Sequence, residues 1–147
     1  MTFQLDATLA ADTHPILELL LCTALLMNDQ RFPWLILVPR IENARDLMDL
    51  SRADRQTLSD EIDTVSRALR DQASEEAPVD KMNVASLGNM VPQLHIHIIA
   101  RRTADAAWPR PVWNEGTAVP YDPAALRERV TTLKTRLALP DSREIGI

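Results

Sequence analysis

Alternating polar and apolar side chains just before Ala100 constrain this chain more than any other feature of its sequence. The polar set is Gln93, His95 and His97, and the apolar set is Leu94, Ile96 and Ile98. Because successive side chains of a β-strand point to opposite faces, the pattern predicts a strand with a polar row facing a cleft and an apolar row facing a core. Two imidazoles on one strand suit chemistry near neutral pH, as nucleophile, proton carrier or metal ligand.

The composition sets the class of protein. A chain of 147 residues with 46% hydrophobic and 25% charged residues predicts one globular domain. Its formal net charge of -5 argues against a general affinity for nucleic acids or anionic membranes, so neither is expected as a partner. The lone Cys22 excludes an intrachain disulfide, the first residues lack a signal-peptide pattern, and the apolar run 19–27 is too short to span a bilayer. We therefore expect a cytoplasmic enzyme or binding protein.

The N-terminal third favours strands. Residues 16–27 have high helix propensity, but they end at the turn-like cluster 28–30 and are followed by the strand-like run 32–38. We therefore predict strand–turn–strand over residues 16–38. Two further strands are predicted over 82–87 and 94–100.

Two helices are predicted from apolar stripes and capping residues. The first runs from Ser51 to about Gln72, with Ser51 and Asp54 forming a capping box, and the second begins after Asp122 with Pro123 in its first position. Their stripes are Leu58, Ile62, Val65 and Leu69, and Leu126, Val130, Leu133 and Leu137. Strands and helices do not alternate as βαβ units, so an α+β fold with an antiparallel sheet is favoured.

The histidine pair has three interpretations. The two rings can be purely structural, or they can be half of a metal site, or one can act as a nucleophile with the other assisting. A zinc site needs three or four protein ligands, and no nearby Cys, Asp or Glu completes the set, while His14 lies far upstream. The surroundings favour the nucleophile, because the polar residues Asn83, Ser86 and Asn89 precede the pair near Gly88 and Arg101 follows it, and all could receive a phosphate.

The segment 88–101, Gly-Asn-Met-Val-Pro-Gln-Leu-His-Ile-His-Ile-Ile-Ala-Arg, resembles the motif of the histidine triad (HIT) family. The resemblance extends over residues 15–105, since 26–39 look like the first hairpin of that family and the predicted helix 51–72 falls where its long helix lies. It implies a five-stranded antiparallel sheet with a long helix, usually in a homodimer, that hydrolyses or transfers nucleotidyl groups with no obligatory metal. Magnesium would enter only with the substrate phosphates. Residues 106–147 then form a C-terminal extension with its own helix.

Aligned with that motif, Gln93 stands at the first histidine, His95 at the second and His97 at the third. The resemblance implies that His95 attacks the α-phosphate to form a nucleotidyl-histidine intermediate, which water then cleaves, and that His97 contacts the phosphoryl group or the leaving group. Asn28 and Asn83 resemble substrate contacts, and Asn89 replaces the usual Gln. We expect the Gln93 amide to hold the His95 ring, because its carbonyl can accept from an imidazole N–H.

The substrate is predicted only as a class. We expect hydrolysis of nucleoside polyphosphates or related phosphoanhydrides, such as dinucleoside polyphosphates. The alternatives are an adenosine phosphoramidase or nucleotidyl transferase using the same intermediate, and a nucleotide-binding protein without turnover. Trp108 and Trp113 either contact a base or hold the C-terminal segment on the sheet.

Overall fold

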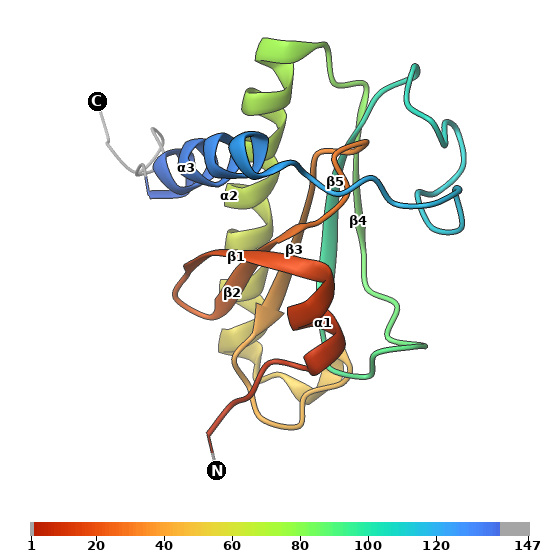
Figure 1. The fold of residues 1–147 in the computed structure, drawn as a ribbon. Helices are drawn as coiled ribbons and strands as arrows, with labels where there is room; N and C mark the ends of the chain where they lie inside the picture. Colours follow the sequence, from red (N-terminus) through yellow and green to blue (C-terminus); the bar gives the residue numbers. More distant parts are fainter. Residues whose placement is uncertain (1, 139–147) are drawn as a thin grey trace.

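A five-stranded antiparallel sheet is the centre of the fold in a computed structural model of the chain (Figure 1). The structure describes residues 2–138, except for the side chains of residues 74–76. The strands are β1 (Thr13–Glu18), β2 (Cys22–Met27), β3 (Trp34–Pro39), β4 (Lys81–Ala85) and β5 (Ile96–Arg101). Their order across the sheet is β1-β2-β3-β5-β4, so a three-stranded meander meets a β4–β5 pair at the β3–β5 seam. The predicted α+β class with an antiparallel sheet is confirmed.

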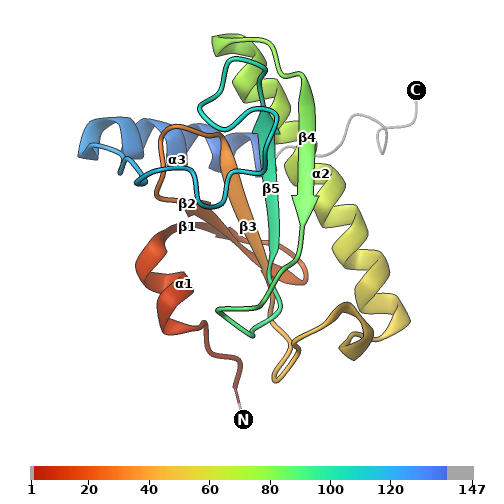
Figure 2. The same cartoon turned by 90° about the vertical axis from the view of Figure 1, so that its right-hand side faces the viewer.

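Helices cover both faces of the sheet. The short α1 (Ala7–Asp12) lies on one face and the long α2 (Arg52–Glu76) on the other, as Figure 2 shows, and α3 (Pro123–Ala138) crosses α2. A 3₁₀ turn, η1 (Leu47–Asp49), precedes α2. The sequence analysis predicted α2 and α3 but neither α1 nor η1.

The predicted N-caps of the two long helices, Ser51 and Asp122, are confirmed. The Ser51 side chain accepts a hydrogen bond from the Asp54 N–H, and the Asp122 side chain accepts from the N–H groups of the second and third residues of α3. The end of α2 was predicted too early, near Gln72. The helix runs to Glu76 because Ala and Glu favour it, and Pro78 then excludes the helical conformation at Ala77.

The run 16–27 was predicted as one strand, and this is wrong. It belongs to two strands, β1 and β2, which are joined by a turn in which the Leu19 N–H donates to the Cys22 carbonyl. The buried carboxylate of Glu61 on α2 accepts the N–H groups of Leu21 and Cys22 at 2.7 and 3.0 Å. These contacts satisfy the turn without Gly or Pro, which is why no turn residue marks it in the sequence.

Apolar side chains from alternate positions fill two cores, one on each face of the sheet. The α2 and α3 stripes pack against the side of β5 that carries Leu94, Ile96 and Ile98. The other face holds a smaller cluster of Leu9, Phe32, Trp34, Ile36 and Val112 with their neighbours. This second face is the one on which the histidines lie, as the alternation predicted.

Candidate active site

The two histidines lie at the start of the central strand β5. His95 immediately precedes the strand, and His97 pairs with Ile36 of β3 on one side and Ala85 of β4 on the other. Each residue is only 6% exposed, and the ring centroids are 4.9 Å apart. Hydrogen-bonded neighbours on both sides therefore hold the backbone of His97 rigidly.

A backbone contact orients the His95 ring. Its Nδ1 lies 2.6 Å from the carbonyl oxygen of Gln93. A carbonyl can only accept a hydrogen bond, so Nδ1 carries the proton and the lone pair of neutral His95 is on Nε2. This is the arrangement that a nucleophilic imidazole requires.

His97 takes the opposite role at its Nδ1. The indole Nε1–H of Trp34 donates to that atom at 3.1 Å, and the two ring centroids are 5.6 Å apart. An indole N–H can only donate, so the proton of neutral His97 is on Nε2. Burial, followed by the charge of His95, lowers the pKa of His97 from 6.5 to about 4, so that the ring is neutral at physiological pH.

Aromatic rings surround His97. Trp113 meets it edge to face with the centroids 5.1 Å apart, and Trp113 also contacts Trp34 at 6.0 Å. Of the two tryptophans predicted near the site, Trp113 is thus next to a histidine, whereas Trp108 lies over the guanidinium of Arg101. Trp34 was not among the site residues predicted from the sequence, where its only signal was its place near the start of a predicted strand.

The Gln93 amide does not hold His95. Its Oε1 accepts the N–H of Asp6 at 2.9 Å and its Nε2 donates to the carbonyl of Gln4 at 2.8 Å. The predicted orienting contact to His95 comes from the backbone carbonyl of the same residue instead. The side chain therefore ties the N-terminal segment to the entrance of β5.

Arg101 and Asn83, both predicted to contact a phosphate, lie together and bind each other instead. The fully buried Arg101 makes two hydrogen bonds to the Asp105 carboxylate, and its Nη1 donates to the Asn83 side chain at 2.9 Å. Its Nη2 also donates to the carbonyl of Arg110. In this arrangement Arg101 supports the loop after β5 from inside the protein, and its guanidinium is not presented to a phosphate as the sequence analysis expected.

Asn28 is likewise engaged by the chain itself. It follows β2, and its side-chain carbonyl accepts the N–H of Tyr121 at 3.1 Å. The next residues of this turn also bind the segment 115–121, through contacts from Asp29 and Gln30 to Val119 and from Arg31 to the Glu115 carbonyl. Asn28 thus belongs to a tie between the β2–β3 turn and the segment that leads into α3.

Ser86 and Asn89 lie in the loop between β4 and β5, and both are exposed. Ser86 directly follows Ala85, the partner of His97, so it is at the edge of the histidine pair. Gly88 has a φ of 83°, a backbone conformation that residues other than Gly rarely adopt. Of the predicted phosphate contacts, these two are the exposed ones, whereas Asn28 and Asn83 are partly buried and Arg101 is buried.

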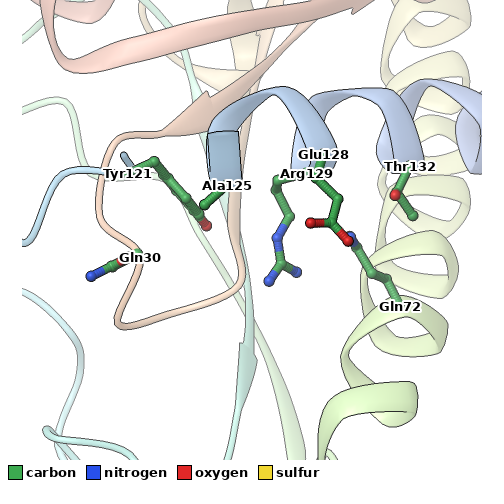
Figure 3. Close-up of a pocket in the computed structure, with 7 residues that line it drawn as sticks. All are labelled: Gln30, Gln72, Tyr121, Ala125, Glu128, Arg129 and Thr132. Atoms are coloured by element: carbon green, nitrogen blue, oxygen red, sulfur yellow. The ribbon is translucent and has the colours of Figure 1, made fainter. Parts of the chain in front are cut away.

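One cavity adjoins the site, and another lies beside α3. One of about 430 Å³ separates the N-terminal segment from the loop after β3 and includes Gln93 in its wall, so it adjoins the residue that orients His95. The other, of about 370 Å³, lies beside α3 and is lined by Gln30, Gln72, Tyr121, Ala125, Glu128, Arg129 and Thr132 (Figure 3). None of the residues predicted to act on substrate lines this second cavity.

The described residues meet the requirements of neither a metal site nor a membrane span. Over residues 2–138, no three or more His, Cys, Asp and Glu side chains are gathered as ligands of a metal ion would be. Within the same range, none of the helices combines the length and the apolar composition that a membrane crossing requires.

Comparison with protein families gives a match to the HIT domain over residues 8–104. The chain belongs to the HIT family. The matched residues include the motif around His95 and all five strands, whereas α3 lies outside them. No curated protein matches the chain.

Solved structures of HIT proteins resemble this HIT chain over nearly its whole length. A histidine triad protein from Marinobacter aquaeolei VT8 is 44% identical, covers 93% of this chain and 97% of its own, and has a TM-score of 0.88. One from Bradyrhizobium japonicum is 42% identical, with coverages of 93% and 99% and a TM-score of 0.88. One from Sinorhizobium meliloti 1021 is 39% identical, with coverages of 91% and 96% and a TM-score of 0.86. The similarity therefore extends beyond the residues matched by the family, into the region of α3.

Proposed function

We propose that this HIT protein hydrolyses nucleoside polyphosphates or related phosphoanhydrides through a nucleotidyl-histidine intermediate on His95. The observation that carries the proposal is the 2.6 Å contact between His95 Nδ1 and the Gln93 carbonyl. It commits one ring nitrogen to the backbone and leaves the lone pair on the other, as nucleophilic catalysis by an imidazole requires. HIT proteins are in general nucleotide-binding hydrolases and transferases, which supports the substrate class.

In the first step, His95 Nε2 attacks the α-phosphorus. A P–N bond forms, the P–O bond to the leaving phosphoryl group breaks, and the electron pair of that bond stays on the leaving oxygen. In the second step a water molecule attacks the same phosphorus and gives up a proton to the solvent, the P–N bond breaks with its electron pair returning to His95 Nε2, and a nucleoside monophosphate leaves with the neutral ring restored. A phosphoramidase or a transferase differs only in the leaving group or in the acceptor.

His97 supplies a hydrogen-bond donor beside the nucleophile. Because Nδ1 of His97 accepts from Trp34, its Nε2–H is available to a phosphoryl oxygen or to the leaving oxygen. The two adjacent rings thus have complementary Nε2 atoms, a lone pair on His95 and a proton on His97. Ser86 and Asn89 would add polar contacts from the exposed loop.

Several other features belong to the proposal. Gln93 replaces the first histidine of the triad, and its backbone carbonyl takes over the contact to the nucleophile. The protein acts as a cytoplasmic homodimer and needs no obligatory metal, although magnesium can accompany the substrate phosphates. Without turnover, the same site would make it a nucleotide-binding protein.

The test is to trap the intermediate. The purified protein is mixed with substrates labelled at the α-phosphate (a diadenosine polyphosphate, adenosine phosphoramidate and a nucleotide sugar) and is then denatured in alkali, where a P–N bond to histidine survives. We expect label on the peptide that contains His95, and turnover reduced by several orders of magnitude in His95→Ala with substrate binding retained.

Two results would contradict the proposal. Label found on His97 would show that His97, and not His95, is the nucleophile. Tight nucleotide binding with neither label nor turnover for any substrate of the panel would favour the binding protein.

A further inference from the structure

Trp34 and His97 form a hydrogen bond between two strands, and the proposed mechanism depends on this bond for the Nε2–H of His97. Trp34 begins β3, His97 lies on β5, and the indole Nε1–H points to Nδ1 of the imidazole at 3.1 Å. Both side chains are buried, at 4% and 6% exposure. Because buried polar groups need partners, neither nitrogen can give up this bond without cost.

From this contact we infer that Trp34 is a positioning residue, which fixes His97 in the Nε2–H tautomer and so makes it a hydrogen-bond donor at the reacting phosphoryl group. The inference rests on the proposed function for its consequence, but the tautomer itself does not depend on any reaction. An indole nitrogen never accepts a hydrogen bond, so the Nδ1–H tautomer would place two N–H groups against each other.

The same contact opposes the charged form of His97. A doubly protonated ring would also present an N–H to the indole N–H and would be buried among Trp34, Trp113 and the nearby His95. The titratable group in ring contact with His97 is His95, and the positive charge of that ring would add repulsion. Trp34 therefore holds His97 in one tautomer and adds to the burial that keeps its ring neutral.

Packing alone does not explain the tautomer of His97, because two tryptophans pack against its ring and only one of them donates a hydrogen bond to it. Trp113 contacts the same imidazole ring at 5.1 Å, nearer than the 5.6 Å of Trp34, but the hydrogen bond to His97 comes from Trp34. Substitution of each tryptophan by Phe removes an indole from the same ring cluster. Only Trp34→Phe removes the donor to Nδ1.

The first experiment is nuclear magnetic resonance of the ¹⁵N-labelled native protein without substrate. We expect a scalar coupling across the hydrogen bond between Trp34 Nε1 and His97 Nδ1, a pyridine-type ¹⁵N shift for Nδ1 and a pyrrole-type shift for Nε2. A pyrrole-type shift at Nδ1 of His97 would overturn the inference. Since neither signal depends on turnover, failure of the proposed reaction leaves this result readable.

The second experiment compares Trp34→Phe with Trp113→Phe. In Trp34→Phe, the two ¹⁵N shifts of His97 should move toward each other as both tautomers become populated, and kcat should fall about 10–100-fold with a smaller change in KM. Trp113→Phe should leave the His97 shifts in place. Unchanged His97 shifts in Trp34→Phe would overturn the inference.

A third variant covers the case in which Trp34→Phe does not fold. Site-specific incorporation of benzothienylalanine at position 34 replaces the indole N–H by sulfur in nearly the same shape. It should abolish the coupling and mix the tautomers, and a retained Nε2–H tautomer would overturn the inference.

Discussion

Arg101 and Asp105 form a two-point ion pair inside the protein, with Nε to Oδ2 at 2.7 Å and Nη2 to Oδ1 at 3.0 Å. Both side chains are almost fully buried, at 2% and 6% exposure. Burial would raise the pKa of Asp105, but the hydrogen bonds from Arg101 and from backbone N–H groups hold it below its usual value. The loop after β5 is therefore built on a charged pair.

Removing the carboxylate charge should be strongly destabilising. Asp105→Asn leaves the Arg101 guanidinium buried without its counter-charge, and we expect the free energy of unfolding to fall by about 3–5 kcal/mol in chemical denaturation. The control is Asp63→Asn, which breaks the Arg67–Asp63 pair at the same sequence spacing but with side chains 42% and 47% exposed. That change should cost about 0.5 kcal/mol or less. Equal losses in the two variants would contradict the prediction.

The depressed pKa of His97 predicts a loss of stability in mild acid. Its pKa is about 4 in the folded protein and 6.5 ordinarily, so the unfolded chain binds more protons between these values and stability falls as pH is lowered through that window. From about pH 7 to pH 5 the contribution of His97 to the free energy of unfolding should decrease by about 2 kcal/mol. Denaturation curves at the two pH values measure it.

His97→Gln is the control for this pH effect. Its amide oxygen can still accept from Trp34 but does not titrate. The decrease between the two pH values should therefore be smaller in the variant by about 2 kcal/mol. The prediction fails if wild type and variant respond equally to pH.

Glu61 on α2 should contribute to stability through its bonds to the β1–β2 turn. Glu61→Gln keeps the shape but replaces one acceptor by an amide N–H that faces a backbone N–H of the β1–β2 turn. We expect a loss of about 1–3 kcal/mol in the free energy of unfolding. Asp60→Asn, an exposed neighbour on α2, should change it by about 0.5 kcal/mol or less. An unchanged free energy of unfolding in Glu61→Gln would show that the turn does not need the carboxylate.

The two contacts of the Gln93 amide separate its structural role from catalysis. Gln93→Leu removes the bonds to Gln4 and Asp6 but keeps the backbone carbonyl that orients His95. We expect faster amide hydrogen exchange at Asp6 and a loss of about 1 kcal/mol in stability, with kcat far less affected than by His95→Ala. Gln4→Ala should leave exchange unchanged, because Gln4 contributes only its backbone carbonyl. A kcat as low as that of His95→Ala would assign the orienting role to the amide after all.

Elements with a local signal could be predicted from the sequence. The apolar stripe after Ser51 and the Asp122–Pro123 start of α3 depend on side chains within a few residues, and both helices begin where they were predicted. The alternation around His95 and His97 likewise assigned the two faces of β5 correctly. In each case the interaction that defines the element lies within the element.

The features that were missed depend on distant partners. The β1–β2 turn is satisfied by Glu61, about forty residues away, and the ring of His97 is held by Trp34 across the sheet. For Gln93 the sequence could not show whether the backbone or the amide would reach His95, because the N-terminal segment competes for the amide. In each case local sequence favours no alternative over another, and contacts with residues distant in sequence determine which one forms.

The β3–β5 seam has a consequence for the order of folding. The β1–β2–β3 meander and the β4–β5 pair each join strands that are neighbours in sequence, whereas the seam joins two halves separated by the whole of α2. Closing so long a loop is entropically costly and is expected to come late. Trp34 and His97, 63 residues apart in sequence, face each other across that seam. The chain therefore acquires its paired imidazoles in their working tautomers only when this long-range pairing is made, and a molecule that has not yet made it has strands and helices but no site.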